Sequence, residues 1–209
     1  MRSREFHGTV ISGWFTPEQG AWLRARVEGL DGAAIALVGI YQGLNLSYIA
    51  ETCRDHGVRI YAVDVWEKIG ATLNGTQRLP WLALWRFRRD LKRARRRFGR
   101  WVRRHGFADH VVVLHDRSTA AARSFADASL DFVFLDADHG YEAVCQDLEA
   151  WYGKLKPGRL IAGDDWDTGK WPGVVRAVEE FAAARGLRVQ VEDNLWSLEK
   201  PQDDAPACP

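Results

Sequence analysis

Residues 33–39 read Ala-Ala-Ile-Ala-Leu-Val-Gly, an apolar run that ends in a glycine. A run of this kind is typical of a strand buried on both faces of a parallel sheet. Outward from it, short apolar runs alternate with segments of helical periodicity. We therefore predict an α/β fold with a Rossmann-like, doubly wound and mostly parallel sheet. Further strands are expected at residues 58–63, 110–114, 130–135 and 159–162, and helices at 44–55, 119–125, 141–151 and 172–185.

The two ends of the chain complete this organisation. Residues 16–19 (Thr-Pro-Glu-Gln) combine an N-cap, a first-turn proline and a glutamine three residues after the cap, so residues 1–31 are predicted as a helical lead-in. Residues 187–192 and 196–200 flank Asp193-Asn194 and predict a C-terminal antiparallel hairpin, which brings the sheet to seven strands. Residues 201–209 are expected to be a flexible tail. The 209 residues are predicted to form a single domain.

The charge is unevenly distributed. Residues 78–104 contain twelve Lys or Arg and one acid, Asp90, whereas the rest of the chain has 17 basic and 27 acidic residues. Residues 78–105 are therefore predicted as a basic amphipathic helix inserted between the second and third strands. Its basic face could be merely solvated while the helix packs on the sheet edge or in a homodimer. It could also form a lid for an anionic acceptor, or contact a membrane surface or a nucleic acid.

Features of export are not visible in the sequence. It contains no apolar run long enough to span a membrane, and residues 1–8 lack the apolar stretch of a signal peptide. Its three cysteines are odd in number and far apart, which favours reduced thiols. A cytoplasmic location without a membrane span is expected.

A glycine-bearing turn follows the first strand of the sheet. Gly39 and Gly43 have the spacing G-x-x-x-G, which differs from the G-x-G-x-x-G of dinucleotide-binding proteins and argues against NAD. Glycines here let backbone N–H groups approach a small charged ligand, such as the amino-acid end of S-adenosylmethionine. They could equally do no more than permit a tight turn.

Polar residues also follow the second and third strands. Asp64 lies 25 residues after Gly39, where a carboxylate can accept hydrogen bonds from both hydroxyls of a ribose, although it could be only a solvated strand-end residue. Asp116 and Ser118 follow the third strand, where an adenine would lie. Ser118 could instead cap the next helix.

Three carboxylates follow the fourth and fifth strands. Asp136 begins the motif Asp-Ala-Asp-His, and Asp164 and Asp165 follow Gly163. Neighbouring strand ends lie about 5 Å apart, so these groups are expected to converge and to repel one another unless a cation is bound. Oxygen ligands favour Mg²⁺, and then Mn²⁺ or Ca²⁺. The alternative is that Asp138 caps a helix and that Asp164 and Asp165 are loop acids.

These motifs together resemble a known family. The stretches LVGIYQGLNLSYIAE, VRIYAVDVW, LDFVFLDADHGYEAVCQDLEAWYGKLKPG and LIAGDDW are similar to class I S-adenosylmethionine-dependent methyltransferases. The likeness is greatest to bacterial metal-dependent small-molecule O-methyltransferases of the macrocin and cephalosporin pathways, and more distant to catechol O-methyltransferases. It covers roughly residues 13–200 except the basic insertion.

The resemblance implies roles for individual residues. It assigns Asp136, Asp164 and Asp165 to the metal, and it places Asp138 or His139 where relatives keep a catalytic base. The sequence departs from the family pattern at Leu37, where an acid is usual, and at Asn45, where serine is usual. The residues expected around the cofactor are Gly39, Tyr41, Gly43, Asn45, Asp64, Asp116, Ser118 and Asp136.

The expected function is methyl transfer to a hydroxyl of a small molecule, such as a sugar, a phenol or a natural-product intermediate, with an anionic acceptor as one option. A nucleic-acid partner is not expected, because the sequence shows no separate RNA-binding module. Two alternatives stay open: an RNA- or nucleotide-directed methyltransferase that uses the basic helix, and a non-catalytic nucleotide-binding scaffold.

Overall fold

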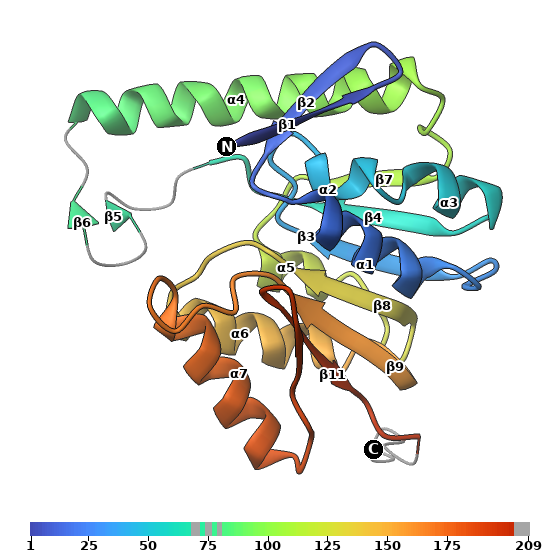
Figure 1. The fold of residues 1–209 in the computed structure, drawn as a ribbon, viewed down its shortest axis with the longest axis vertical. Coiled ribbons are helices and arrows are strands. Elements are labelled where there is room, and N and C mark those ends of the chain that lie inside the picture. The colour runs from blue at the N-terminus through green and yellow to red at the C-terminus, as the bar shows by residue number, and fades with distance from the viewer. Residues whose placement is uncertain (68–71, 74–76, 79–80, 203–209) are drawn as a thin grey trace.

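A seven-stranded sheet forms the centre of the fold (Figure 1). The structure is a computed structural model, and it describes residues 1–67, 72–73, 77–78 and 81–202. The strand order is β10-β11-β9-β8-β3-β4-β7. These strands are β3 (Ala34–Val38), β4 (Arg59–Val63), β7 (Val111–Leu114), β8 (Leu130–Leu135), β9 (Leu155–Gly163), β10 (Gln190–Glu192) and β11 (Leu195–Glu199).

The topology is doubly wound. From β3 the chain proceeds through β4 to β7 at one edge, and then returns to β8 on the other side of β3. All neighbours from β7 to β9 pair in parallel, whereas β11 is antiparallel to both β9 and β10. The predicted fold class is confirmed. Val38 pairs with Val63 on one side and Leu135 on the other, so the residues that follow these three strands meet where the strand order reverses.

Helices cover both faces of the sheet. One face carries α1 (Pro17–Val27), α2 (Leu44–Ser47), α3 (Ala50–Asp55) and α4 (Trp81–Arg104), and the other carries α5 (Ser118–Ala122), α6 (Tyr141–Tyr152) and α7 (Pro172–Ala184). Side chains of a strand alternate between faces. Accordingly, Ile35 and Leu37 of β3 pack under the first group of helices, while Ala36 and Val38 pack under the second.

The N-terminal region differs from the prediction. The helix begins at the expected capping box, in which the Thr16 hydroxyl accepts a hydrogen bond from the Gln19 backbone N–H. Residues 2–13, however, form an antiparallel hairpin of β1 (Arg2–Phe6) and β2 (Thr9–Gly13), so a helical lead-in is wrong for them. The reason is burial: Phe6 packs edge-on against Trp101 of α4, which gives the hairpin an apolar side.

Smaller differences concern element ends. The helix expected at 44–55 is divided into α2 and α3, and β9 begins at Leu155, within the segment that was expected to end a helix. Leu155 pairs with Leu130 and a register shift follows.

The inserted basic helix is confirmed as α4, preceded by the short strands β5 (Thr72–Leu73) and β6 (Gln77–Arg78). Residues 203–209 of the expected tail lie outside the described residues. Among the helices of the described chain, none combines the length and the apolar composition needed to cross a membrane.

Candidate active site

The glycine turn after β3 allows two close approaches. Gly39 has a φ of +92°, and a Cβ added to it would lie 1.7 Å from the backbone oxygen of Asp136. Gly43 has a φ of +84°, and its Cβ would lie 2.7 Å from the ring of Phe98 in α4. Both positions therefore require glycine for conformation and for space. The turn is packed between the end of β8 and the basic helix.

Asp64, at the end of β4, holds this turn in place. Its Oδ2 accepts hydrogen bonds from the backbone N–H groups of Ile40 (2.9 Å) and Tyr41 (2.8 Å), and its Oδ1 accepts one from Trp66 N–H (2.6 Å). The buried Asn45 side chain donates to the carbonyl of Gly39 at 3.0 Å. Asp64 thus has a structural role that the sequence did not indicate, and its ribose contact remains a prediction.

Tyr41 connects the turn to α4. Its hydroxyl donates to Asp90 at 2.7 Å, and its backbone carbonyl accepts from the indole N–H of the buried Trp66 at 2.7 Å. Burial, and then the hydrogen bond to Asp90, raise the pKa of the Tyr41 hydroxyl. The glycine turn and the basic helix are therefore joined by a polar contact as well as by packing.

The two residues expected near an adenine lie in different surroundings. Asp116 is exposed after β7, and its Oδ1 accepts from the backbone N–H of Arg117. Ser118 starts α5, and its hydroxyl accepts from the indole N–H of Trp151 in α6 at 2.9 Å. This bond ties α5 to α6. The adenine contact of either residue remains a prediction.

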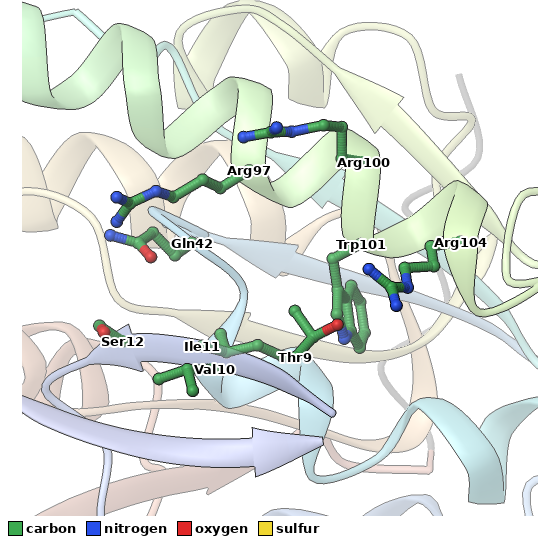
Figure 2. A pocket seen from close by; sticks show the side chains of 9 residues that line it. All are labelled: Thr9, Val10, Ile11, Ser12, Gln42, Arg97, Arg100, Trp101 and Arg104. Atoms are coloured by element: carbon green, nitrogen blue, oxygen red, sulfur yellow. The ribbon is translucent and has the colours of Figure 1, made fainter. Parts of the chain in front are cut away.

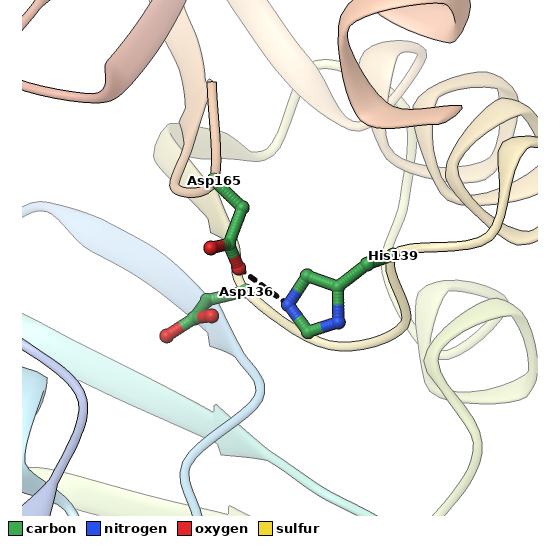
Figure 3. Close-up of side chains that lie close together, drawn as sticks. All are labelled: Asp136, His139 and Asp165. Carbon is green, nitrogen blue, oxygen red and sulfur yellow. Dashed lines mark ion pairs between the residues drawn. The ribbon is translucent and has the colours of Figure 1, made fainter. Parts of the chain in front are cut away.

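The acidic cluster consists of Asp136, His139 and Asp165, which each offer one ligand atom within 4.8 Å of the others (Figure 3). Asp136 follows β8, His139 precedes α6, and Asp165 follows β9. His139 Nε2 lies 2.5 Å from Asp165 Oδ2, and the imidazole stacks on Trp171 with ring centroids 4.3 Å apart. It is the one group of this kind in the part of the chain that the structure describes.

Asp164 lies beside the cluster but is not a member of it. Its side chain is buried, and its Oδ1 accepts from the side chain of Gln19 at 2.7 Å and from the backbone N–H of Asp165 at 2.7 Å. Asn194 also reaches this oxygen, at 3.4 Å. Asp165 has a φ of +66°, which turns the chain so that Asp165 and Asp164 point to different surroundings. The structure therefore groups His139, rather than the predicted Asp164, with Asp136 and Asp165.

The electrostatics of the cluster suit a cation. Burial raises the pKa of Asp136 well above its usual range, and the nearby carboxyls of Asp164, Asp165 and Asp64 raise it further. Burial likewise raises the pKa of Asp164 to about 6. A bound divalent ion would relieve this repulsion. Two carboxylates and an imidazole fit such an ion, but the imidazole moves the preference from Mg²⁺ toward a transition metal ion such as Mn²⁺.

Asp138, the other candidate base, is exposed. Its Oδ1 accepts from the backbone N–H of Gly140 at 2.9 Å, just before α6 begins. Asp138 is not the helix cap that the alternative interpretation expected, because the N-cap residue of α6 is Gly140 and no side chain caps it. Asp138 also borders a cavity of about 20 Å³ that is lined by Asp136, Asp147 and Asp164.

We expect Asp147 to impose a pH dependence on stability. Its side chain is buried in α6, and burial raises its pKa to about 6. Because the folded protein then binds this proton more tightly than the unfolded chain, the free energy of unfolding should fall as pH rises from about 4 to about 6. Asp147→Asn should remove that part of the fall and stabilise the protein at pH 7.5 by up to about 3 kcal/mol.

Urea unfolding between pH 4.5 and 8 measures this effect. Asp127→Asn is the control, because Asp127 is exposed and its pKa is lowered by Lys154, so its loss should act in the opposite direction. An unchanged pH profile in Asp147→Asn would contradict the assignment.

Comparison with known proteins agrees with this architecture. A seven-stranded, doubly wound sheet with an antiparallel strand inserted near one edge and a glycine turn at the switch point defines the fold of class I S-adenosylmethionine-dependent methyltransferases. Residues 37–166 match the family described as "Methyltransferase domain", and the chain belongs to that family. A search of curated proteins gives no match.

Several solved structures share the fold. The O-methyltransferase NovP is 19% identical with a TM-score of 0.64, over 88% of this chain and 80% of NovP. The methyltransferase PaMTH1 of Podospora anserina, solved with S-adenosylhomocysteine bound, is 14% identical with a TM-score of 0.62, over 90% and 80% of the two chains. The calicheamicin methyltransferase CalS11 is 16% identical with a TM-score of 0.57, over 88% and 80%.

Proposed function

We propose that this protein transfers a methyl group from S-adenosylmethionine to a hydroxyl of a small molecule, assisted by a divalent metal ion. The observation that carries the proposal is the cluster of Asp136, His139 and Asp165 beside the switch point of the sheet, next to the glycine turn. A methyltransferase fold provides the binding site for the methyl donor. The cluster supplies a place at which an acceptor hydroxyl can be held and made more anionic.

The cofactor is proposed to lie across the carboxyl ends of β3, β4 and β8. In this proposal the turn presents backbone groups to the amino-acid end, and Asp64, which follows the next strand, binds the ribose. NovP and the PaMTH1 complex support this placement by their shared fold. The residues proposed to surround the cofactor are Gly39, Tyr41, Gly43, Asn45, Asp64, Asp116, Ser118 and Asp136.

The acceptor is proposed to lie over the acidic cluster. A divalent ion bound there by Asp136, Asp165 and either His139 or Asp164 would lower the pKa of an acceptor hydroxyl. His139 or Asp138 would take up the proton. Trp171, which stacks on His139, is proposed to form an aromatic wall that orients the acceptor.

Asp64 offers a test of the cofactor site. Asp64→Ala should weaken binding of S-adenosylhomocysteine by about 10- to 150-fold, because a hydrogen bond to a charged group contributes about 1.5–3 kcal/mol. Isothermal titration measures the affinity. Asp55→Ala is the control, because Asp55 is an exposed acid at the end of α3. Unchanged affinity in Asp64→Ala would reject the cofactor assignment.

A second ligand separates ribose binding from support of the turn. If Asp64 contacts the ribose, the variant should bind the 2′,3′-dideoxy form of S-adenosylhomocysteine, which keeps the amino-acid end, as well as the wild type does. If Asp64 acts only by holding the N–H groups of Ile40 and Tyr41, both ligands should lose affinity equally.

Methyl-transfer assays with sugars, phenols and nucleotide-linked hydroxyls identify the acceptor class. Transfer only to nitrogen or carbon would reject O-methylation.

A further inference from the structure

A second pocket lies between the N-terminal hairpin and α4 (Figure 2). Its volume is about 610 Å³, which is within the range of small-molecule sites. Residues 9–12 of β2 form one wall, the C-terminal part of α4 forms the other, and Gln42 of the glycine turn closes one side. None of these residues belongs to the acidic cluster.

Three arginines of α4 line this pocket. Arg97, Arg100 and Arg104 are separated by three and four residues, so they share one flank of the helix, as Figure 2 shows. None of them forms an ion pair with a carboxylate of the described residues. The pocket therefore concentrates positive charge that nothing in the described chain neutralises.

The nearest acid on the same flank is already engaged. Asp90 lies seven residues before Arg97 and accepts the hydroxyl of Tyr41 at 2.7 Å. The hairpin wall, residues 9–12, is Thr-Val-Ile-Ser and contributes no charge. An anion that enters the pocket would thus meet guanidinium groups, hydroxyls and apolar surface, and no carboxylate of the lining.

A buried hydrogen-bond donor lies in the same wall. Trp101 is 2% exposed, and its indole N–H has no hydrogen-bond partner among the described residues. Leaving a buried donor unpaired costs about 1–3 kcal/mol. Gln42, also buried, adds an amide next to Arg97 in Figure 2. The unpaired indole N–H lies behind the pocket surface, so a ligand oxygen would reach it only if this wall opens.

We propose that this pocket binds a small phosphorylated compound, with the phosphate held by Arg97, Arg100 and Arg104. Planar guanidinium groups bind phosphate through paired hydrogen bonds. Val10, which is exposed and lines the pocket, provides apolar surface for the organic part of the ligand. Arg97, Arg100 and Arg104 are as exposed as Arg95 and Arg103, but only the first three line a walled pocket, which favours a small molecule over a nucleic acid that would contact all five.

Isothermal titration without cofactor tests the proposal. The probes are inorganic phosphate, glucose 6-phosphate and glycerol 3-phosphate, with glucose and glycerol as the uncharged counterparts of the two organic phosphates. We expect a phosphorylated probe to bind and its counterpart not to. The double variant Arg97→Gln/Arg104→Gln should weaken binding at least about tenfold, as expected for hydrogen bonds to a charged group. Trp101→Phe should weaken it less, because only one donor is lost.

The matched control is Arg95→Gln/Arg103→Gln, which removes the same charge from exposed residues of the same helix that do not line the pocket. We expect less than a twofold change. Equal losses in the two double variants would indicate diffuse attraction of anions, and would overturn the proposal. The proposal would also be overturned if a 12-nucleotide RNA bound more tightly than the small probes and both double variants weakened its binding alike. Failure of every phosphorylated probe to bind would overturn it as well. Because no cofactor or methyl transfer is involved, each of these outcomes leaves the proposed function standing.

Discussion

Methyl transfer by this protein is expected to stop when a chelator is present in excess, and to return when Mn²⁺ or Mg²⁺ is added. The physical reason is the cluster of Asp136, His139 and Asp165, whose ligand atoms lie within 4.8 Å and whose central carboxyl has a raised pKa because it is buried among other acids. A bound metal ion contributes several kcal/mol to charge stabilisation, so the loss should be at least about 100-fold. Cofactor affinity should change little.

Variants separate the ligands of this ion. Asp136→Asn and Asp165→Asn should each reduce the affinity for Mn²⁺, measured by titration without acceptor, and should weaken the restoration of activity. Asp164→Asn should reduce the Mn²⁺ affinity less than these two variants do if the Asp164 side chain stays bonded to Gln19. It should reduce the affinity equally if the side chain turns to bind the ion. Glu142→Gln is the control, because this nearby acid is exposed in the first turn of α6. Full activity in excess chelator would leave a metal-independent methyltransferase.

The strand pattern was sufficient to predict the sheet, because β3, β4 and β8 are mostly apolar and are followed by glycine or aspartate. The N-terminal hairpin was missed, because only Phe6 and Ile11 are apolar and fully buried in β1 and β2. One local signal could have revealed it, namely Gly8, because glycine readily adopts a positive φ. In the structure His7 and Gly8, with φ values of 45° and 74°, form the two-residue turn that joins β1 to β2. The pocket against α4 was missed with the hairpin.

The site was predictable to the level of strand ends but not of side chains. Sheet order placed Asp136, Asp164 and Asp165 together. Which of the two neighbouring aspartates faces Asp136 depends on contacts that are distant in sequence. Gln19, 145 residues away, binds Asp164, and Trp171 supports His139 by stacking. Local sequence contains no signal for such contacts.

Whether His139 is the general base depends on whether it binds the metal ion instead. Its Nε2 is the atom that lies 2.5 Å from Asp165 and the atom that would bind an ion in the cluster. With Nε2–H donated to Asp165 and the ring stacked on Trp171, the imidazole is fixed in orientation, and Nδ1 is the nitrogen that could accept a proton. If Nε2 is instead taken by a metal ion, the proton must pass to the exposed Asp138.

We expect His139→Ala to lower kcat by about 10²- to 10⁴-fold while the affinity for S-adenosylhomocysteine stays the same, because general-base catalysis contributes that much. Asp138→Ala should lower kcat less than tenfold. Mn²⁺ titration of both variants decides the role that is lost. Retained Mn²⁺ affinity in His139→Ala identifies a base, whereas reduced affinity, together with a large loss of turnover in Asp138→Ala, assigns His139 to the metal and the base to Asp138. Full activity in both variants and in the double variant His139→Ala/Asp138→Ala would mean that neither side chain removes the proton.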